Sequence, residues 1–512
     1  MAQYDDALSA TNPAMPRMIH RPLVLLRNAG MPCLLALGTL LLGSCYARSD
    51  RGAVIVSAIG GAPTLADAAV EPMNFPSRVL RDATAQGLVR FDATGQIEPG
   101  LAERWTVIDD GMSYIFRLRE SEWGDGHAVG AGEVVKAIDR QLVRGSRNPA
   151  APFLTAVEDT VEMTPEVIQI HLKRPRPDLL KLFAQPEMAI VRTRRPAGTG
   201  PFRIIRRSAH GVTLRPAFDP ARLDAEEIAE PGPEQNINLI GERASRALAR
   251  FVSRQSDLVL GGSYIDWPLV PLAGIAAANI RVDPAAGLFG IGIARRNGFL
   301  ADAANRAALA EAIDRNAIVA AYAPGWAAAE QILPDQLDSA SAAVQPSWQS
   351  LSAGERHVAA RGQIALWRKT HPGPVNLTLA MPSGPGATIL YGFVAAAWRS
   401  IGVEVRRVPQ GADADLRIID AVAPYDSARW YLATACAPCS DAAQTLLEAA
   451  RDATTLNERA RLIADADLAL SNDVPVIVIA RPLRWSLVAL RLHAWQPNSR
   501  AWHPLNHLRT GN

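Results

Sequence analysis

Residues 113–119 alternate apolar and polar side chains in the order SYIFRLR. This period of two is typical of a half-buried strand and predicts one face formed by Tyr114, Phe116 and Leu118 or by their neighbours. Turn dipeptides flank the strand, because glycine accepts a positive φ and aspartate bonds to the backbone just after it. The two dipeptides are Asp110-Gly111 and Asp125-Gly126.

Residues 132–144 change to a helical spacing of apolar positions. The stripe can cover the predicted β-rich layer, and it consists of Val134, Val135, Ile138 and Leu142. Trp105 and Trp123 belong to the same region. We interpret them as core or hairpin anchors and not as platforms for a ligand.

Later segments alternate between helix and strand patterns. Helices are predicted at 305–322 and 387–401, and strands at 212–215, 402–405 and 474–479. The last of these is a β-branched apolar run that suits a buried strand returning the chain to a first lobe. With 512 residues, far above the usual size of a single core, this alternation predicts an α/β protein of two hinged lobes.

Composition and charge describe an ordinary globular protein. The chain is 48% apolar and 20% charged, with a formal net charge of +2. Its positive residues are scattered and lack the interleaved aromatic residues that stack on bases. No nucleic-acid partner is expected.

The N-terminus has the features of an export signal. Basic residues precede a short apolar run at 31–42, which is too short for a membrane span. These residues are Arg17, His20, Arg21 and Arg27. The polar start is unusual for a signal, so translation could begin at Met15 or Met18.

The apolar run ends in Leu42-Gly43-Ser44-Cys45, which resembles the lipobox of bacterial lipoproteins. The resemblance implies that residues 1–45 form a signal peptide with its lipobox and that lipidated Cys45 anchors the mature chain to the membrane. An ordinary cleaved signal with Cys45 as a free thiol is the alternative.

Cys436 and Cys439 are separated by two residues. In an exported chain this spacing favours a structural disulfide, while a thioredoxin-like redox pair would need a strand-to-helix junction. A zinc site shared with His503 and His507 is a further alternative, although that histidine pair lies far downstream and contains Pro504.

Residue types along 87–140 resemble those of the family 5 extracellular solute-binding proteins, the peptide and nickel receptors of ABC importers. The matching positions are Gly87-Leu88-Val89, PGLAERW at 99–105, Asp109-Asp110-Gly111, Tyr114, Phe116, Leu118-Arg119, Trp123 and Asp125-Gly126. Later matches are GTGPF at 198–202, AIDR at 312–315 and WQPN at 495–498.

The resemblance implies an α/β fold of the type II periplasmic-binding-protein class, with two hinged lobes and an extra β-rich subdomain in the first lobe. It places the first lobe at 52–80, 190–285 and 475–512, the extra subdomain at 81–189 and the second lobe at 286–474.

The implied function is capture of a peptide-like solute in the cleft between the lobes and its delivery to a membrane permease. The expected partners are the solute and the permease and ATPase subunits of an ABC importer. The chain is expected to be a periplasmic, lipid-anchored monomer without enzymatic activity, cofactor or metal. An enclosed peptide needs partners for its amides, its amine and its carboxylate, because unpaired buried polar groups are costly.

Three candidate ligand contacts follow from the family's ligand-contacting segments: Glu71, Phe153 and Arg417. Each could equally be a solvated charge or an ordinary core aromatic residue.

The segment after Arg417 departs from the family pattern. Peptide receptors carry a tryptophan and, three residues later, an aspartate that holds the peptide amine, whereas this chain has Asp420 and Ala423. Asp420 or Asp426 has therefore taken over the amine, or the ligand has no free amine. Tyr425 in this segment is a further candidate ligand contact.

Competing functions are a non-transport sensor or chaperone that uses the same cleft, and capture of a metal chelate or another small molecule. A chelate site would need clustered side chains, but the spacing of His127, His171 and His210 suggests no common site. A hydrolase is disfavoured, because PSGPG at 382–386 lacks the glycine before serine of a nucleophile elbow.

Overall fold

A computed structural model gives the fold. It describes residues 52–192, 198–217, 230–335, 337–436 and 438–509. The predicted signal and Cys45 lie outside the described residues. Within these ranges no helix combines the length and apolarity that a membrane span would need.

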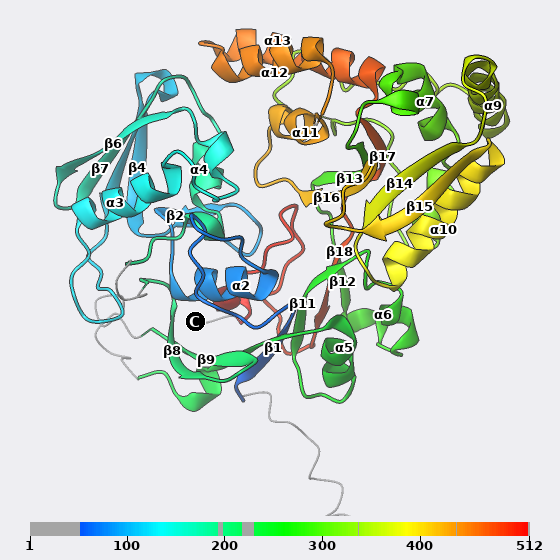
Figure 1. Cartoon of the computed structure of the whole chain (residues 1–512). Coiled ribbons are helices and arrows are strands. Elements are labelled where there is room, and N and C mark those ends of the chain that lie inside the picture. The colour runs from blue at the N-terminus through cyan, green and yellow to red at the C-terminus, as the bar shows by residue number, and fades with distance from the viewer. Residues whose placement is uncertain (1–51, 193–197, 218–229, 336, 437, 510–512) are drawn as a thin grey trace, which may run out of the picture. The chain divides into compact units, whose positions relative to one another are not determined.

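A seven-stranded sheet has the strand order β12-β18-β11-β1-β10-β9-β8 (Figure 1). Its strands are β1 (Val54–Ile59), β8 (Phe202–Arg207), β9 (Gly211–Pro216), β10 (Ile237–Glu242), β11 (Leu258–Ser263), β12 (Ile280–Asp283) and β18 (Arg484–Val488). Central β1 runs parallel to β10 and β11. Helices α2 (Phe75–Thr84) and α5 (Ala244–Val252) pack on β1, and short α6 (Leu269–Leu272) follows β11.

A five-stranded sheet has the order β15-β14-β16-β13-β17. Its strands are β13 (Gly287–Ile293), β14 (Val375–Met381), β15 (Val403–Pro409), β16 (Leu416–Val422) and β17 (Val476–Ala480). All residues of β13 and β17 are buried, as expected for uninterrupted apolar strands. The helices that precede or link these strands are α7 (Ala303–Glu311), α8 (Arg315–Ala320), α9 (Ala353–Thr370) and α10 (Pro385–Ser400).

A four-stranded antiparallel sheet, β4-β5-β7-β6, lies within the region predicted as the extra subdomain. Its elements are β4 (Ala102–Ile108), β5 (Ser113–Leu118), β6 (Val157–Thr164) and β7 (Val167–Leu172), with the hairpin of β2 (Val89–Phe91) and β3 (Ile97–Pro99) and helices α3 (Ala131–Leu142) and α4 (Leu179–Phe183) beside it. The predicted face of Tyr114, Phe116 and Leu118 is confirmed, since these side chains are 3%, 0% and 4% exposed.

Three further helices, α11 (Ala428–Ala435), α12 (Asp441–Asp452) and α13 (Leu456–Asp473), pack against one another. A disulfide joins Cys436 and Cys439 in the loop between α11 and α12, the pairing that the export signal favoured. His503 and His507 bind other partners, Asp283 and Glu98, and no cluster among the described residues is arranged to hold a metal.

The chain passes between the two large sheets through residues 284–286 and returns through 481–483. These connections lie side by side, because β12 pairs with β18 and β13 pairs with β17. Arg481 of the returning connection donates to the carbonyl of Gly287, directly after the other connection, and also to the Ile332 carbonyl. At Gly287 φ is +153°, and a Cβ would lie 2.1 Å from the Ala421 carbonyl oxygen.

Two predictions about boundaries need correction. The expected helix at 305–322 is two helices, α7 and α8, because the Asp314 side chain accepts from Ala317 N and caps a new helix. The strand expected to return to the first lobe, β17, instead pairs with β13 in the five-stranded sheet, so the return begins after Ala480. An apolar run identifies a buried strand but not its sheet.

Asp473, the last residue of α13, is a buried carboxylate that accepts hydrogen bonds from several donors. It receives both terminal nitrogens of Arg296 at 2.5 Å, Arg306 at 3.0 Å and the Ser440 amide at 2.9 Å. Burial raises the pKa of Asp473, but these donors outweigh burial and hold the pKa below its usual value. Arg306, 1% exposed, also binds the Asp473 carbonyl, next to Val474 in the left-handed region at φ +47°.

We predict that Asp473→Asn lowers the free energy of unfolding by about 3–5 kcal/mol, because it leaves buried Arg306 without its counter-charge. Urea denaturation followed by circular dichroism measures the change. The matched control is Asp465→Asn, which removes an exposed i,i+4 pair with Arg461 and should change stability by less than about 0.5 kcal/mol. Equal effects of the two substitutions would contradict the role of Asp473.

Candidate functional site

A cavity of about 700 Å³ lies between segments of the two large sheets, the four-stranded region and the C-terminal segment. Its walls come from β11 and β18, from β16 and the loop after it, from residues 149–153 and 185–187, and from residues 500–503. This volume falls within the range of small-molecule sites, about 300–1,000 Å³.

The floor of the cavity is shaped by a bulge in β11. The register with β18 shifts between Val259 and Gly262, and Gly261 has φ +86°. A Cβ on Gly262 would lie 2.2 Å from the ring of Trp485. Glycine at this position therefore allows Trp485 to lie against the strand, where its Nε1 donates to the Ser263 carbonyl at 2.9 Å.

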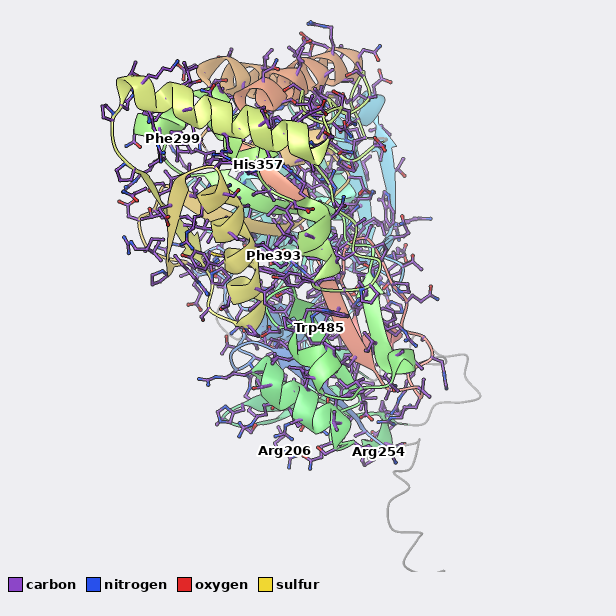
Figure 2. All side chains as sticks on the ribbon, turned by 90° about the vertical axis from the view of Figure 1, so that its right-hand side faces the viewer. Arg206, Arg254, Phe299, His357, Phe393 and Trp485 are labelled. Atoms are coloured by element: carbon purple, nitrogen blue, oxygen red, sulfur yellow. A yellow bond between two sulfur atoms is a disulfide. The ribbon has the colours of Figure 1, made fainter. Side chains whose placement is uncertain are left out.

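Trp485 is 1% exposed and lies among densely packed side chains, below Phe393 of α10 in the view of Figure 2. Other aromatic rings complete the walls. Phe75 packs edge-on against Trp502 with ring centroids 5.9 Å apart, and Arg78 lies 4.9 Å above the Trp502 ring. Trp430 also lines the cavity. The surface is therefore rich in rigid apolar groups.

The wall also contains pairs of oppositely charged side chains. Asp420 of β16 accepts from Arg484 of β18 at 2.8 Å, and Glu187 lies 2.5 Å from Arg78. Two predicted ligand contacts, Phe153 and Asp420, line this cavity.

The other predicted contacts lie elsewhere. Tyr425 is fully buried, stacks edge-on with Phe153 and receives a hydrogen bond from Arg176 at 3.0 Å. Asp426 binds Lys181 at 2.5 Å and also Arg500. Arg417 is an exposed residue of β16. None of these three belongs to the walls of the described cavities.

Glu71 lines a second cavity, of about 660 Å³, and not the one that contains Asp420. Its surroundings include the ion pair of Arg140 with Asp67 and the buried Arg81. Burial lowers the pKa of Arg81, whose guanidinium donates to the Ala66 and Ala189 carbonyls. The six candidates thus do not form one site.

Sequence reasoning missed several residues that build the main cavity: Arg484, Trp485, Arg500 and Trp502. They lie more than 60 residues after Asp420 in the chain and reach it only through the return of β18 to the seven-stranded sheet. The tryptophans near the C-terminus were the only sequence feature that could have indicated these wall residues, but their spacing in the sequence gives no sign that they lie near β16.

Comparisons with known proteins agree with this architecture. The glutathione-binding protein GsiB of Escherichia coli O157:H7 is 27% identical over 203 residues, which cover 37% of this chain and 37% of that protein. The match thus spans little more than a third of that relative's length.

Two solved structures share the fold. The Haemophilus influenzae OppA complex with the peptide RPPGFSPFR has a TM-score of 0.75 at 15% identity and covers 89% of this chain and 99% of OppA. The Escherichia coli murein tripeptide binding protein MppA has a TM-score of 0.74 at 18% identity and covers 88% and 98% of the two chains. The fold is therefore the two-lobed, type II periplasmic-binding-protein fold that the sequence predicted.

Residues 96–419, more than half of the chain, match the family described as bacterial extracellular solute-binding proteins, family 5 Middle. The chain is consequently a member of the family 5 bacterial extracellular solute-binding proteins.

Proposed function

We propose that this protein is the substrate-binding component of an ABC importer, which captures peptide-like solutes in the cavity around Asp420 and delivers them to a membrane permease. The observation that carries the proposal is the position of this cavity, which is walled by both large sheets and lies beside the two connections between them. A site built from two hinged bodies binds most tightly when they close on the ligand.

The proposed lobes follow the sheets. The first comprises 52–80, 190–285 and the chain after the return at 481–483, with 81–189 as its extra subdomain. The second begins near 286 and includes β17. We further propose export to the periplasm, attachment through lipidated Cys45 and action as a monomer that meets the permease and ATPase subunits.

A set of contacts between the proposed lobes supports a closed arrangement. Asp426 follows β16 and binds Lys181 and Arg500, which come from the subdomain and the C-terminal segment. Gln185 also donates to the Pro424 carbonyl at 2.9 Å. These bonds connect the proposed second lobe to the first and would break when the lobes separate.

Peptide capture is tested by native mass spectrometry of protein purified from a bacterial periplasm. We expect a bound mass that releases short peptides. Ala421 lines the cavity, so Ala421→Trp should abolish co-purification by filling it. Ala412→Trp, on an exposed turn, is the control and should retain the ligand. A single non-peptide mass would instead favour another solute.

The contacts of Asp426 with Lys181 and Arg500 lead to a prediction about the shape of the protein in solution. Burial raises the pKa of Asp426, but Lys181 and Arg500 outweigh burial and hold the pKa below its usual value. Asp426→Asn should weaken the closed state by roughly 1–2 kcal/mol, since charge-assisted bonds are lost from a carboxylate that is 44% exposed.

Small-angle X-ray scattering of the ligand-free protein measures this change as a larger radius of gyration. Asp465→Asn, which removes an exposed carboxylate from α13, should leave the radius unchanged. An unchanged radius in the Asp426 variant would contradict the role of this contact.

Asp178 leads to a prediction about pH. Burial and the neighbouring Asp338 raise its pKa to about 6. Since the folded protein then binds more protons than the unfolded chain, stability falls as pH rises from about 4 to 6. Asp178→Asn should raise the free energy of unfolding by about 1–2 kcal/mol at pH 7 and leave it nearly unchanged at pH 4.

Urea titrations at the two pH values check this expectation. Exposed Asp159 provides the control, because Asp159→Asn should give the same small change at both values. A gain for Asp178→Asn that is equal at pH 4 and pH 7 would show that the carboxylate's charge is not responsible.

A further inference from the structure

Every charged side chain that the structure describes on the wall of the main cavity already has an ionic or hydrogen-bonding partner within this chain. The pairs are Asp420 with Arg484 at 2.8 Å, Arg78 with Glu187 at 2.5 Å, Asp283 with His503 at 3.1 Å, and Arg500 with Asp426. Among the described residues, a ligand that enters this cavity therefore meets no charged side chain that lacks a partner.

Of the two predicted amine partners, Asp420 is the one that lines the cavity, and Arg484 already binds it. The same guanidinium donates to the Leu483 carbonyl at 2.9 Å and to the Asp420 carbonyl at 3.2 Å. These two main-chain bonds hold Arg484 in place independently of the carboxylate. An incoming ammonium must therefore compete with a fixed cation for Asp420.

Displacement would leave the Arg484 charge without a counter-ion in a site where its side chain is only 19% exposed. Isolating one partner of a buried pair is strongly unfavourable. A ligand could avoid this penalty by offering an amine to Asp420 and a carboxylate to Arg484 together. The ends of a peptide are too far apart for that, because each residue adds roughly 3.3 Å, whereas a single α-amino acid carries both groups on one carbon.

The rest of the wall favours uncharged groups. Trp430, Trp485 and Trp502 line the cavity together with Phe75 and Phe153. Aromatic surfaces bind apolar and aromatic ligand groups through burial and edge-to-face contacts. The charge balance and the aromatic wall thus point to the same ligand chemistry.

We infer that the cavity selects peptide-like ligands whose ends carry no charge, with apolar or aromatic side chains. This inference rests on the proposed function and specifies its substrate class. Asp420 and Arg484 then act as a specificity-determining pair that disfavours free ammonium and carboxylate ends.

The test compares the binding of matched tripeptides to the purified protein after its bound ligand has been removed by unfolding and refolding. The probes are mixtures of Phe-, Leu- and Trp-containing tripeptides, either with free ends or acetylated and amidated, with free phenylalanine as a third probe. Isothermal titration calorimetry gives the affinities. We expect the capped tripeptides to bind about tenfold or more tightly than the free ones.

Two variants test whether the Asp420–Arg484 pair causes this preference for capped tripeptides. Arg484→Met frees Asp420 and should improve the binding of peptides with a free amine about tenfold, relative to the unsubstituted protein. The double substitution Asp420→Asn with Arg484→Met should remove that gain. A gain in binding cannot come from a failure to fold.

The outcomes separate this inference from the proposed function. Free tripeptides that bind as tightly as capped ones would overturn the inference and leave peptide capture standing. Tight binding of phenylalanine alone would assign the pair to a single amino acid and overturn both. Absence of binding by every probe would also overturn peptide capture, and the inference with it.

Discussion

Two short connections, at 284–286 and 481–483, constrain most of what this molecule can do. On one side of these connections β12 pairs with β18, and on the other side β13 pairs with β17. The two large sheets are therefore joined at the ends of these four strands. Arg484 comes directly after one connection, and Asp420 pairs with Phe289, close to the end of the other. The central ion pair of the cavity is therefore positioned by the same backbone that connects the two large sheets.

Charge balance is the second constraint on the site. Ionised groups taken out of water need partners, and the protein supplies them from distant parts of its own sequence. Asp420 and Arg484 are 64 residues apart, and Asp283 and His503 are 220 apart. Such pairs fix the relative position of segments from different sheets. Because these ion pairs already satisfy the charges of the wall, a ligand gains affinity mainly through its shape and its apolar contacts.

The sequence predicted the local structure better than the site, for a physical reason. The alternation of apolar and polar residues at 113–119 identified β5 and its buried face, because the period of a strand depends only on residues adjacent in the sequence. The sheet to which β17 belongs depends on its pairing with β13, almost 200 residues earlier. The helix break before α8 required the capping of Ala317 by Asp314, a contact that the apolar stripe of 305–322 does not reveal.

The same reasoning explains why the candidate contacts separated in space. Comparison with the family's segments proposed Asp420 and Phe153 as candidates, and both line the main cavity. It could not show that Asp426 is bound by Lys181 and Arg500, because those partners lie 245 and 74 residues away. Asp426 binds two cations and is not part of the cavity wall, whereas Asp420 binds one arginine and lines the cavity. The position of each carboxylate relative to the cavity thus depends on its three-dimensional partners more than on its place in a motif.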